Sequence, residues 1–286
     1  MIDRQMERLV DFRRVFAHVV VARAGCPENQ SLLQAFSDVP RHEFLGAGPW
    51  AVTEDGTATA SDDPALVYQD IGIGIATGIP SGLPSLHARL LDAIGLMHDW
   101  RVMQVGAGTG YFTAILAELV GSAGHVQAFE INEALATRAR ASLARWPQAS
   151  VELRSGVGRP DHPVDLVYDL IYVNAGVQQL PRAWIDALAP GGSLLVPLVA
   201  TDGQGAVYLI RRGTGERHPA RFVCRARFVP CIGTQDAASS ARLSEALRAD
   251  GCEAVRSLRL APERPDATSW LTGDGWWLST AAAPDA

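Results

Sequence analysis

Three glycines stand at alternate positions in "VGAGTGY", between an apolar run and an amphipathic one. They are Gly106, Gly108 and Gly110. Glycine adopts positive φ at little cost and lets a ligand approach the backbone without meeting a Cβ atom. A helix that begins after such a turn presents unpaired N–H groups and the positive end of its dipole. The spacing therefore predicts a ligand site at a strand-to-helix turn.

The spacing also distinguishes between two classes of ligand. A dinucleotide site has the pattern Gly-x-Gly-x-x-Gly, which places a pyrophosphate on the helix N-terminus. Here Tyr111 occupies the sixth position, and the pattern is Gly-x-Gly-x-Gly. We interpret this glycine spacing as suited to S-adenosylmethionine. Its carboxylate and ribose need close contact with the backbone, but it has no pyrophosphate. An NAD-dependent oxidoreductase is the disfavoured alternative, because Tyr111 stands where its third glycine should be.

An acid supports a ribose-containing ligand. Glu130 ends the apolar stretch "HVQAFE", 20 residues after Gly110. A carboxylate at the end of the second strand can accept hydrogen bonds from both ribose hydroxyls. NAD enzymes share this feature, so it does not choose between the cofactors. The competing interpretation is a solvated acid that caps the next helix.

The elements that position these residues follow from the hydrophobic pattern. Apolar strands alternate with amphipathic helices, which predicts parallel βαβ units in an open α/β sheet. The expected strands are 101–105, 125–130, 150–154, 168–173 and 193–198, and the expected helices are 111–120, 133–145 and 182–189.

The flanking regions differ from this pattern. Residues 2–37 are helical in two segments that separate near "AGCPENQ", turn formers are frequent in 38–50 and 61–70, and a short helix starts near Leu86. Two more strands are expected at 205–211 and 221–230, then a helix in "AASSARLSEALRADG" and two short strands around "TGDGWWLS". We expect three regions: a helical and loop segment 1–85 that covers the site, a ligand-binding domain 86–235, and an α+β extension 236–286.

Composition excludes several classes of function. The net charge is −6 and no basic run is present, so nucleic acid is not an expected partner. All 25 basic residues are arginine, which excludes a Schiff-base lysine and a Walker-type phosphate loop. The four cysteines lack metal-ligand spacing and indicate a reducing compartment. The charged N-terminus does not resemble a signal peptide, and no apolar run approaches about 18 residues. We expect a cytoplasmic protein without a metal site or a membrane partner.

Several stretches carry a resemblance to a known family. "VPRHEFL", "GLPSLHARLLDAI", "VGAGTGY", "FEINEALATRARASL", "APGGSLLVPL" and "RFVP" occur in the order and spacing of protein-L-isoaspartate O-methyltransferases, over roughly residues 8–235. The resemblance implies a Rossmann-like α/β sheet that binds S-adenosylmethionine, with a helical N-terminal part and a small α+β C-terminal extension. It also implies methylation of a carboxylate.

The resemblance assigns roles to individual positions. In the family, the loop before the Pro-x-x-His-Ala segment covers the methyl donor and carries a hydroxyl residue near the substrate carboxylate. The usual hydroxyl position falls on Gly82, and Ser81 precedes it. Together with Asn174, at the end of the fourth strand, these are the expected catalytic positions. The expected cofactor contacts are Ile79, Pro80, His87, Gln104, Gly106, Ala107, Gly108, Gly110, Tyr111, Glu130, Ile131, Asn132, Gly156 and Val157.

Three departures from the family pattern affect the prediction. Gln104 replaces an acid that commonly opens the glycine motif, Val157 replaces an aspartate that meets the adenine, and Gly82 lacks the hydroxyl. These changes affect the prediction of an isoaspartyl acceptor more than they affect the prediction of the cofactor.

Several other candidate residues also have a purely structural interpretation. The alternatives are a helix-packing histidine for His87 and a turn residue for both Asp70 and Asn174. For Trp270, Trp276 and Trp277 the alternative to a binding platform is a place in the core.

Carboxyl methylation needs little acid–base chemistry, because a free carboxylate has a pKa of about 4 and is ionised at neutral pH. The protein still has to align the reacting atoms and exclude water. Alignment alone lowers the reaction barrier by roughly 7–11 kcal/mol in favourable cases. We therefore expect a carboxyl O-methyltransferase that acts on an isoaspartyl or aspartyl peptide or protein. The alternatives are a tailoring enzyme for a natural-product peptide or small-molecule carboxylate, and an inactive S-adenosylmethionine-binding protein. The oligomeric state is left open.

Overall fold

The computed structural model describes residues 2–54, 57–154 and 167–283. The chain divides into two compact units. Unit 1 comprises Met1–Asp99 and Ala107–Leu153, and unit 2 comprises Trp100–Gly106 and Arg154–Ala286. None of the helices in the described ranges has the length and apolar character that a bilayer span requires.

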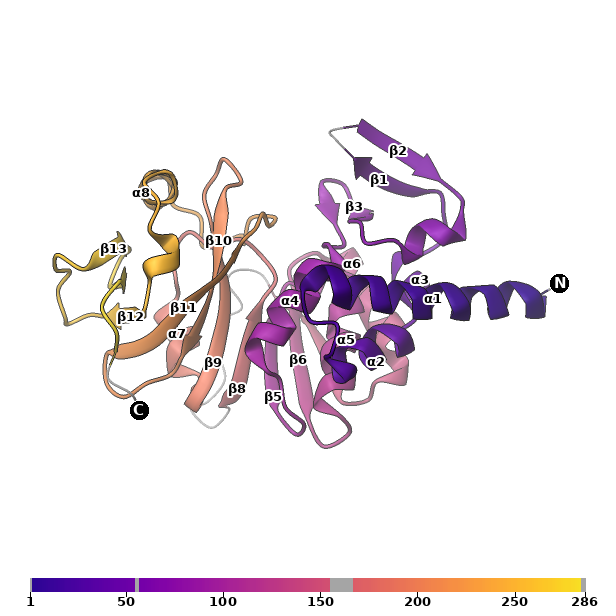
Figure 1. Ribbon diagram of the computed structural model, residues 1–286, viewed down its shortest axis with the longest axis horizontal. Helices are drawn as coiled ribbons and strands as arrows, with labels where there is room; N and C mark the ends of the chain where they lie inside the picture. Colours follow the sequence, from indigo (N-terminus) through magenta and orange to yellow (C-terminus); the bar gives the residue numbers. More distant parts are fainter. Residues whose placement is uncertain (1, 55–56, 155–166, 284–286) are drawn as a thin grey trace. The chain divides into compact units, whose positions relative to one another are not determined.

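Unit 1 is rich in helices. They are α1 (Ile2–Ala24), α2 (Gln30–Asp38), α3 (Arg41–Leu45), α4 (Pro84–Ile94), α5 (Tyr111–Val120) and α6 (Glu133–Ser142), with 3-10 turns η1 (Pro64–Tyr68) and η2 (Leu143–Arg145). Helix α1 packs against α2 and α4 (Figure 1). Their shared core is aromatic: the rings of Phe16 and Phe36 meet edge to face, and Phe36 meets Tyr111 in the same way.

The predicted break between the first two helices is confirmed, and its physical cause is a cap. Helix α2 begins after Asn29, whose side chain accepts a hydrogen bond from the backbone N–H of Leu32. This satisfies one of the free donors at the helix start. The same side chain donates to Asp92 of α4, over 2.8 Å. The cap therefore also ties α2 to α4.

Two hairpins of unit 1 were not predicted. Strands β1 (Trp50–Glu54) and β2 (Thr57–Ser61) form an antiparallel pair, and β3 (Gly74–Ala76) pairs with β4 (Ile79–Pro80). An isolated bridge joins Val52 to Ile73, and both side chains are buried. The sequence analysis missed a hairpin signal here, because Asp55-Gly56 stands between Trp50–Glu54 and Thr57–Ser61 in the sequence.

The βα elements of unit 1 agree closely with the sequence pattern. Strand β6 (His125–Glu130) pairs in parallel with β7 (Ala149–Leu153). Helix α5 and strand β6 have the predicted bounds, and β7 begins one residue earlier than predicted. The predicted helix 133–145 is α6 followed by η2, so its last turn tightens to 3-10 geometry.

Unit 2 is built on a mixed sheet. Its strands are β5 (Arg101–Val105), β8 (Tyr168–Val173), β9 (Leu188–Val199), β10 (Gly205–Arg211), β11 (Arg217–Arg225), β12 (Ser257–Leu260), β13 (Ser269–Thr272) and β14 (Trp276–Ser279). They are ordered β13-β14-β12-β11-β10-β9-β8-β5. The pairs β5–β8 and β8–β9 are parallel, and the others are antiparallel. Helices α7 (Arg182–Asp186) and α8 (Ala237–Arg248) and the turn η3 (Cys252–Ala254) complete the unit.

Three predicted elements of unit 2 were wrong in extent, and one of them is the strand predicted at 193–198, which spans Leu188–Val199. The helix predicted at 182–189 ends at Asp186, because Leu188 already pairs with Tyr168 as the start of β9. The strand predicted at 221–230 instead spans Arg217–Arg225. Its first half contains Pro219, which hides a strand signal, and Pro230 leaves the strand to bridge Gly176.

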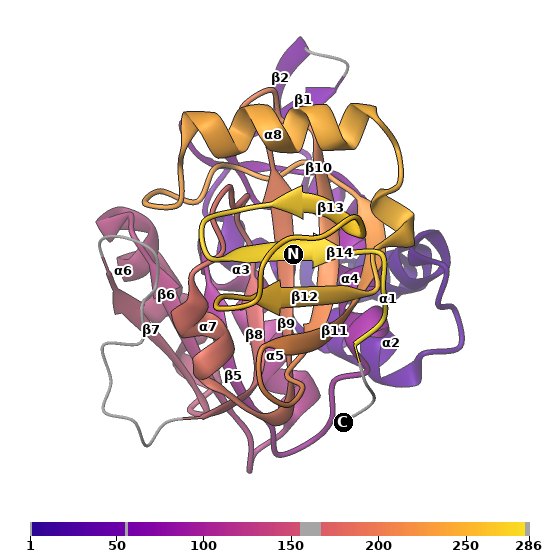
Figure 2. The ribbon, with the colours of Figure 1, turned by 90° about the vertical axis from the view of Figure 1, so that its left-hand side faces the viewer.

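The C-terminal strands β12, β14 and β13 extend this sheet, and α8 runs beside β13 (Figure 2). Strand β12 was not predicted, because its Arg259 interrupts the apolar pattern. That side chain is buried and pairs with Asp266. Trp276 and Trp277 are buried in the core, and Trp270 packs near Tyr208. The tryptophans therefore have the structural role that the sequence allowed as the plainer alternative.

Candidate functional site

The glycine motif connects β5 to α5 through a turn that only glycine fits. Gly106, Gly108 and Gly110 have φ values of +86°, +57° and +92°. Gly110 is the N-cap of α5, and its N–H donates to the carbonyl of Ala107 over 2.9 Å. A Cβ atom on Gly110 would lie 3.1 Å from Cδ1 of Leu143. The turn thus has a backbone conformation that suits glycine, and a side chain at position 110 would meet Leu143.

Gly108 lies against the loop hairpin of β3 and β4. A Cβ atom at this position would lie 3.1 Å from Cδ1 of Ile75. The carbonyl of Ile75 accepts a hydrogen bond of 2.9 Å from the guanidinium of Arg138 on α6. Arg138 therefore ties the β3–β4 hairpin to α6, and the side chain of Ile75 lies close to Gly108.

Glu130 is fixed by two backbone donors. Its Oε2 atom accepts from Gly108 N–H over 2.7 Å, and its Oε1 atom accepts from Asn132 N–H over 2.9 Å. A carboxylate offers about four lone-pair sites, so each oxygen retains one acceptor position. The cap of α6 is Asn132, whose side chain accepts from Leu135 N–H. Glu130 is thus not the helix cap, which removes the plainer alternative for this acid.

In unit 2, two amide side chains hold the carbonyl of Gly106. Gln104 Nε2 and Asn174 Nδ2 each donate to it over 3.3 Å. The backbone N–H of Asn174 also donates to Val105, over 2.8 Å. Gln104 is fully buried, and its Oε1 atom has no hydrogen-bond partner in the described part of the chain. Asn174 therefore anchors the end of β5, and Gln104 carries a buried acceptor that lacks a donor.

Position 82 has no room for a side chain. Gly82 has a φ of +79°, and a Cβ atom there would lie 2.6 Å from Nε2 of His87 and 3.2 Å from Cε2 of Phe112. The ring of His87 stacks on Phe112, with 3.6 Å between centroids and 18° between planes. Burial, then the charge of Arg41, lowers the pKa of His87 to about 3. His87 is thus a neutral, packed ring at neutral pH, and its packing explains the missing hydroxyl at position 82.

Ser81 supplies a hydroxyl next to that position. Its Oγ atom accepts hydrogen bonds from Ile73 N–H over 3.1 Å and from Arg41 Nη2 over 3.2 Å. Its own N–H donates to the carbonyl of Ile73 over 2.7 Å. The hydroxyl is therefore held in one place by two donors.

Asp70 fixes the start of α4. Its Oδ1 atom accepts from Ser85 N–H over 2.8 Å, and its Oδ2 atom pairs with Arg23 at 3.3 Å. The carboxylate is buried although Arg23 is largely exposed. This contact supports the loop-fixing role over that of a plain turn residue.

The remaining candidates vary in accessibility. Tyr111 packs its ring among Phe36, Phe44 and Phe112, and its buried hydroxyl has no hydrogen-bond partner among the described residues. Ile131 is exposed, Ile79 is half-buried, Pro80 is exposed and Ala107 is buried. Gly156 and Val157 lie outside the described residues.

The sequence analysis did not single out Arg41 or Ile75 as site residues. Arg41 belongs to the quoted stretch "VPRHEFL", where an arginine among apolar residues was the available signal. Its side chain is fully buried and contacts Ser81. The sequence pattern around Ile75 did not indicate a site residue, because only the fold of the β3–β4 hairpin brings this side chain close to Gly108.

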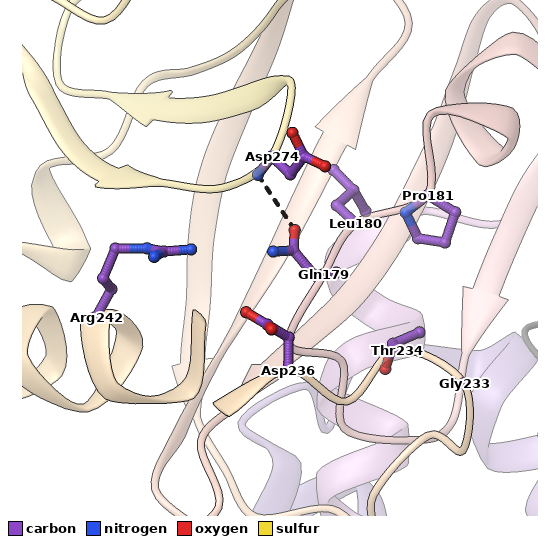
Figure 3. Close-up of a pocket in the computed structure, with 8 residues that line it drawn as sticks. All are labelled: Gln179, Leu180, Pro181, Gly233, Thr234, Asp236, Arg242 and Asp274. Atoms are coloured by element: carbon purple, nitrogen blue, oxygen red, sulfur yellow. Dashed lines mark hydrogen bonds between the residues drawn. The ribbon is translucent and has the colours of Figure 1, made fainter. Parts of the chain in front are cut away.

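Unit 2 also has a pocket of about 660 Å³ (Figure 3). It is lined by Gln179, Leu180, Pro181, Gly233, Thr234, Asp236, Arg242 and Asp274. Gln179 Oε1 accepts from Trp276 Nε1 over 3.1 Å and from Asp274 N–H over 3.3 Å, and its amide nitrogen donates to Ser239. Asp236 caps α8 through Ser239 N–H. These polar groups hold the C-terminal elements together, and the pocket includes none of the predicted site residues.

Comparisons with known proteins find relatives that match most of the chain. A protein-L-isoaspartate O-methyltransferase of Methanoculleus marisnigri is 30% identical over 80% of this chain and 92% of its own length. A protein-L-isoaspartate O-methyltransferase 1 of Rhodopseudomonas palustris is 32% identical over 73% of this chain and 79% of its own length.

Solved structures show the same fold. One protein-L-isoaspartate O-methyltransferase gives a TM-score of 0.65 at 21% identity, over 95% of this chain and 88% of that one. A Plasmodium falciparum protein assigned to the same activity, in complex with S-adenosyl-L-homocysteine, gives 0.62 at 18% identity, over 77% and 97%. The predicted Rossmann-like methyltransferase fold is thereby confirmed.

The family profile of protein-L-isoaspartate(D-aspartate) O-methyltransferase matches residues 20–236, which is more than half of the chain. This confirms the resemblance that the sequence motifs carried, and with it the methyltransferase class. The chain belongs to the protein-L-isoaspartate(D-aspartate) O-methyltransferase family.

Proposed function

We propose that this chain transfers a methyl group from S-adenosylmethionine to the free carboxylate of an isoaspartyl residue in a peptide or protein. The observation that carries the proposal is the Gly108–Glu130 contact of 2.7 Å. It holds a buried carboxylate beside a turn of positive-φ glycines, with one acceptor position left on each oxygen. The names of the relatives support the acceptor class.

The residues present fit S-adenosylmethionine. The two remaining acceptor positions of Glu130 suit the two hydroxyls of a ribose. A Cβ atom on Gly108 would lie 3.1 Å from Cδ1 of Ile75, so a side chain there would crowd the turn. In unit 2, taken by itself, the buried Gln104 Oε1 lacks a hydrogen-bond donor among the described residues, and a buried acceptor without a partner is costly. When bound, S-adenosylmethionine supplies an electrophilic methyl group on a sulfonium.

The chain itself needs to orient and desolvate the acceptor. A carboxylate is already ionised at neutral pH, so no general base is required. We assign the orienting role to the hydroxyl of Ser81, which is held by Arg41 and Ile73. His87 stays neutral at neutral pH because its pKa is lowered to about 3, so it places no charge beside the loop. Asn174 keeps the end of β5 in position through Gly106.

We further propose that the protein works in the cytoplasm. All four cysteines are free and buried, which suits a reducing compartment.

The test is methyl transfer to a matched pair of peptides. The purified protein is incubated with S-adenosylmethionine labelled in its methyl group and with a peptide that contains isoaspartate. The same peptide with ordinary aspartate is the control. We expect a base-labile methyl ester on the isoaspartyl peptide.

Two other outcomes have distinct meanings. Transfer to a small-molecule carboxylate but to neither peptide contradicts the peptide acceptor and identifies a tailoring enzyme. Binding of S-adenosylhomocysteine without transfer to any carboxylate contradicts catalysis and identifies a binding protein.

A further inference from the structure

Arg41 is a buried cation whose partners are neutral. Its side chain is 0% exposed. Nη1 donates to the carbonyls of Val67 and Gln69 over 2.9 and 2.8 Å, and Nη2 donates to the carbonyl of Ile71 over 2.6 Å. Within the described residues, no carboxylate lies at ion-pair distance from the guanidinium. An arginine stays protonated in proteins, so unit 1 contains a positive charge without a direct counter-ion.

The nearest acid named among the influences on Arg41 is already engaged. Asp70 raises the pKa of Arg41, against the larger lowering effect of burial. The Asp70 carboxylate, however, accepts from Ser85 N–H and pairs with Arg23. The aromatic rings of Phe16 and Tyr111 lie 5.6 and 5.8 Å from the guanidinium carbon and stabilise the cation through their faces. Part of the positive field of Arg41 therefore remains uncompensated.

The fourth hydrogen bond of Arg41 reaches Ser81. Nη2 lies 3.2 Å from Ser81 Oγ, and the backbone N–H of Ile73 lies 3.1 Å from the same atom. A hydroxyl has two acceptor lone pairs and one proton to donate. Both lone pairs of Ser81 are used, so its remaining hydrogen-bonding function is to donate. A cationic donor also polarises the hydroxyl and strengthens the bond that it gives.

This arrangement suits an anion. An acceptor carboxylate takes hydrogen bonds and gives none, so a hydroxyl that can only donate is its complement. A neutral amide or alcohol gains less from a site beneath an uncompensated cation. Because position 82 has no room for a hydroxyl, Ser81 is the loop residue that provides one.

We propose that Arg41 is a positioning residue for methyl transfer: by occupying a lone pair of Ser81, it makes that hydroxyl an obligate donor to the acceptor carboxylate. This inference rests on the proposed function, because it takes a carboxylate as the acceptor. Arg41 itself does not touch the acceptor and acts through Ser81.

The test is a double-mutant cycle in two readouts. The variants are Ser81→Ala, Arg41→Lys and the combination of the two. Lysine keeps the charge at position 41. It lacks the planar guanidinium group that donates to three backbone carbonyls and to the Ser81 hydroxyl at the same time. Arg41→Met is less informative, because it leaves three buried carbonyls without their donor and weakens the fold. Arg259→Lys is the matched control, since Arg259 is also buried but lies in unit 2.

The first readout is kinetic, with the isoaspartyl peptide as acceptor. Each single variant loses a hydrogen bond that involves a charged group, so each should lower kcat by roughly tenfold or more. The Kd for S-adenosylhomocysteine should not change. The combined variant should be no slower than the slower single variant, because both remove the same oriented donor. Arg259→Lys should keep the wild-type kcat.

Losses that multiply in the combined variant overturn the proposal. So does a loss of S-adenosylhomocysteine affinity that accompanies the loss of kcat in Arg41→Lys, because a merely structural role predicts it. Ser81→Thr provides the rescue: it keeps the hydroxyl, so it should retain most of the rate beside Arg41 and lose it in the Arg41→Lys background.

The second readout is the free energy of unfolding in urea, which needs no acceptor. If Arg41 and Ser81 are bonded as described, the loss of stability in the combined variant is smaller than the sum of the two single losses. Additive losses overturn the Arg41–Ser81 link, whatever the acceptor is. A wild-type protein that binds S-adenosylhomocysteine but does not methylate the peptide contradicts the proposed acceptor class instead. The two failures are thereby distinguished.

Discussion

Nε2 of His87 lies 2.6 Å from the place where a Cβ atom on Gly82 would stand. The histidine ring therefore fills the space that a side chain at position 82 needs. Since the ring is also stacked on Phe112, it cannot move aside without leaving that contact. Gly82 and His87 form a fitted pair, and the loop places its hydroxyl one residue earlier.

We predict that Gly82→Ser lowers stability and does not raise activity. The new side chain meets the His87 ring and adopts a positive φ of +79°, and overpacking of this kind costs about 1–3 kcal/mol. The matched control is Gly78→Ser, which has a φ of +72° and nothing within 4 Å of its Cβ position. Urea unfolding of both variants isolates the clash from the backbone strain. Equal losses in the two variants would show that His87 yields freely.

A second substitution sharpens this test. In the combination of Gly82→Ser with His87→Ala, the space of the ring becomes free. We expect the combined variant to lose less stability than the sum of the two single losses. A simple sum contradicts the fitted pair.

His87 should make the protein less stable in acid. Its pKa falls from 6.5 to about 3 on folding, chiefly because the ring is buried. Between these values the unfolded chain binds a proton that the native state does not bind. The free energy of unfolding therefore decreases as the pH falls from about 6.5 toward 3.

The measurement is urea unfolding over this pH range for the wild type and for His87→Gln. Glutamine does not titrate, so the variant should lose less stability than the wild type between pH 6.5 and 4. His18→Gln, on the exposed side of α1, is the control and should follow the wild type. Parallel curves for the wild type and His87→Gln contradict the buried neutral ring.

Glu130→Gln should weaken cofactor binding. The amide keeps the shape of the carboxylate but loses its charge and one acceptor oxygen. Charge-assisted hydrogen bonds contribute about 1.5–3 kcal/mol, so the Kd for S-adenosylhomocysteine should rise by roughly tenfold or more. Glu133→Gln, on the exposed side of α6, should bind like the wild type. Titration calorimetry measures both, and an unchanged Kd for Glu130→Gln would mean that the acid only braces the turn.

The glycine turn should distinguish between cofactors. S-adenosylhomocysteine should stabilise the wild type by about 2.7 kcal/mol at one hundred times its Kd, and NAD should not stabilise it. Thermal unfolding with each compound measures the shift. If only NAD stabilises the protein, the prediction of S-adenosylmethionine over NAD, which was based on Tyr111 at the sixth position of the motif, is wrong.

Gly108→Ala should remove the stabilisation by S-adenosylhomocysteine. Its φ is +57° and its Cβ atom would lie 3.1 Å from Ile75, so the narrow space at the turn closes. Gly203→Ala shares a positive φ, +81°, but its nearest neighbour is 3.8 Å away in unit 2. It should keep the ligand response of the wild type. If both variants respond to the ligand, the space above Gly108 is not the binding surface.

The sequence predicted the elements around the glycine motif well and the covering loops poorly. Strand β5, helix α5 and strand β6 follow from apolar runs that are local in the sequence. The bridge between Val52 of β1 and Ile73, just before β3, joins residues that are 21 positions apart in the chain. A single sequence does not reveal such distant pairings.

The same distinction holds for the site. Glu130 and the three glycines were identifiable because each carries a local signal. Arg41 was not identifiable as a site residue, since its role depends on three carbonyls and a hydroxyl that come from a later segment. The lack of room for a side chain at position 82 likewise depends on the ring of His87, five residues later in the chain.

The pairing of β11 with β12 has a consequence for any shortened version of this protein. The family profile ends at residue 236, but β12, β14 and β13 lie beyond that point and continue the sheet from β11. A chain cut at the family boundary would leave the outward-facing N–H and C=O groups at the start of β11 without their partners. Such an open edge is a template for self-association. We therefore expect a chain that ends at residue 236 to self-associate more readily than the chain that keeps β12, β14 and β13.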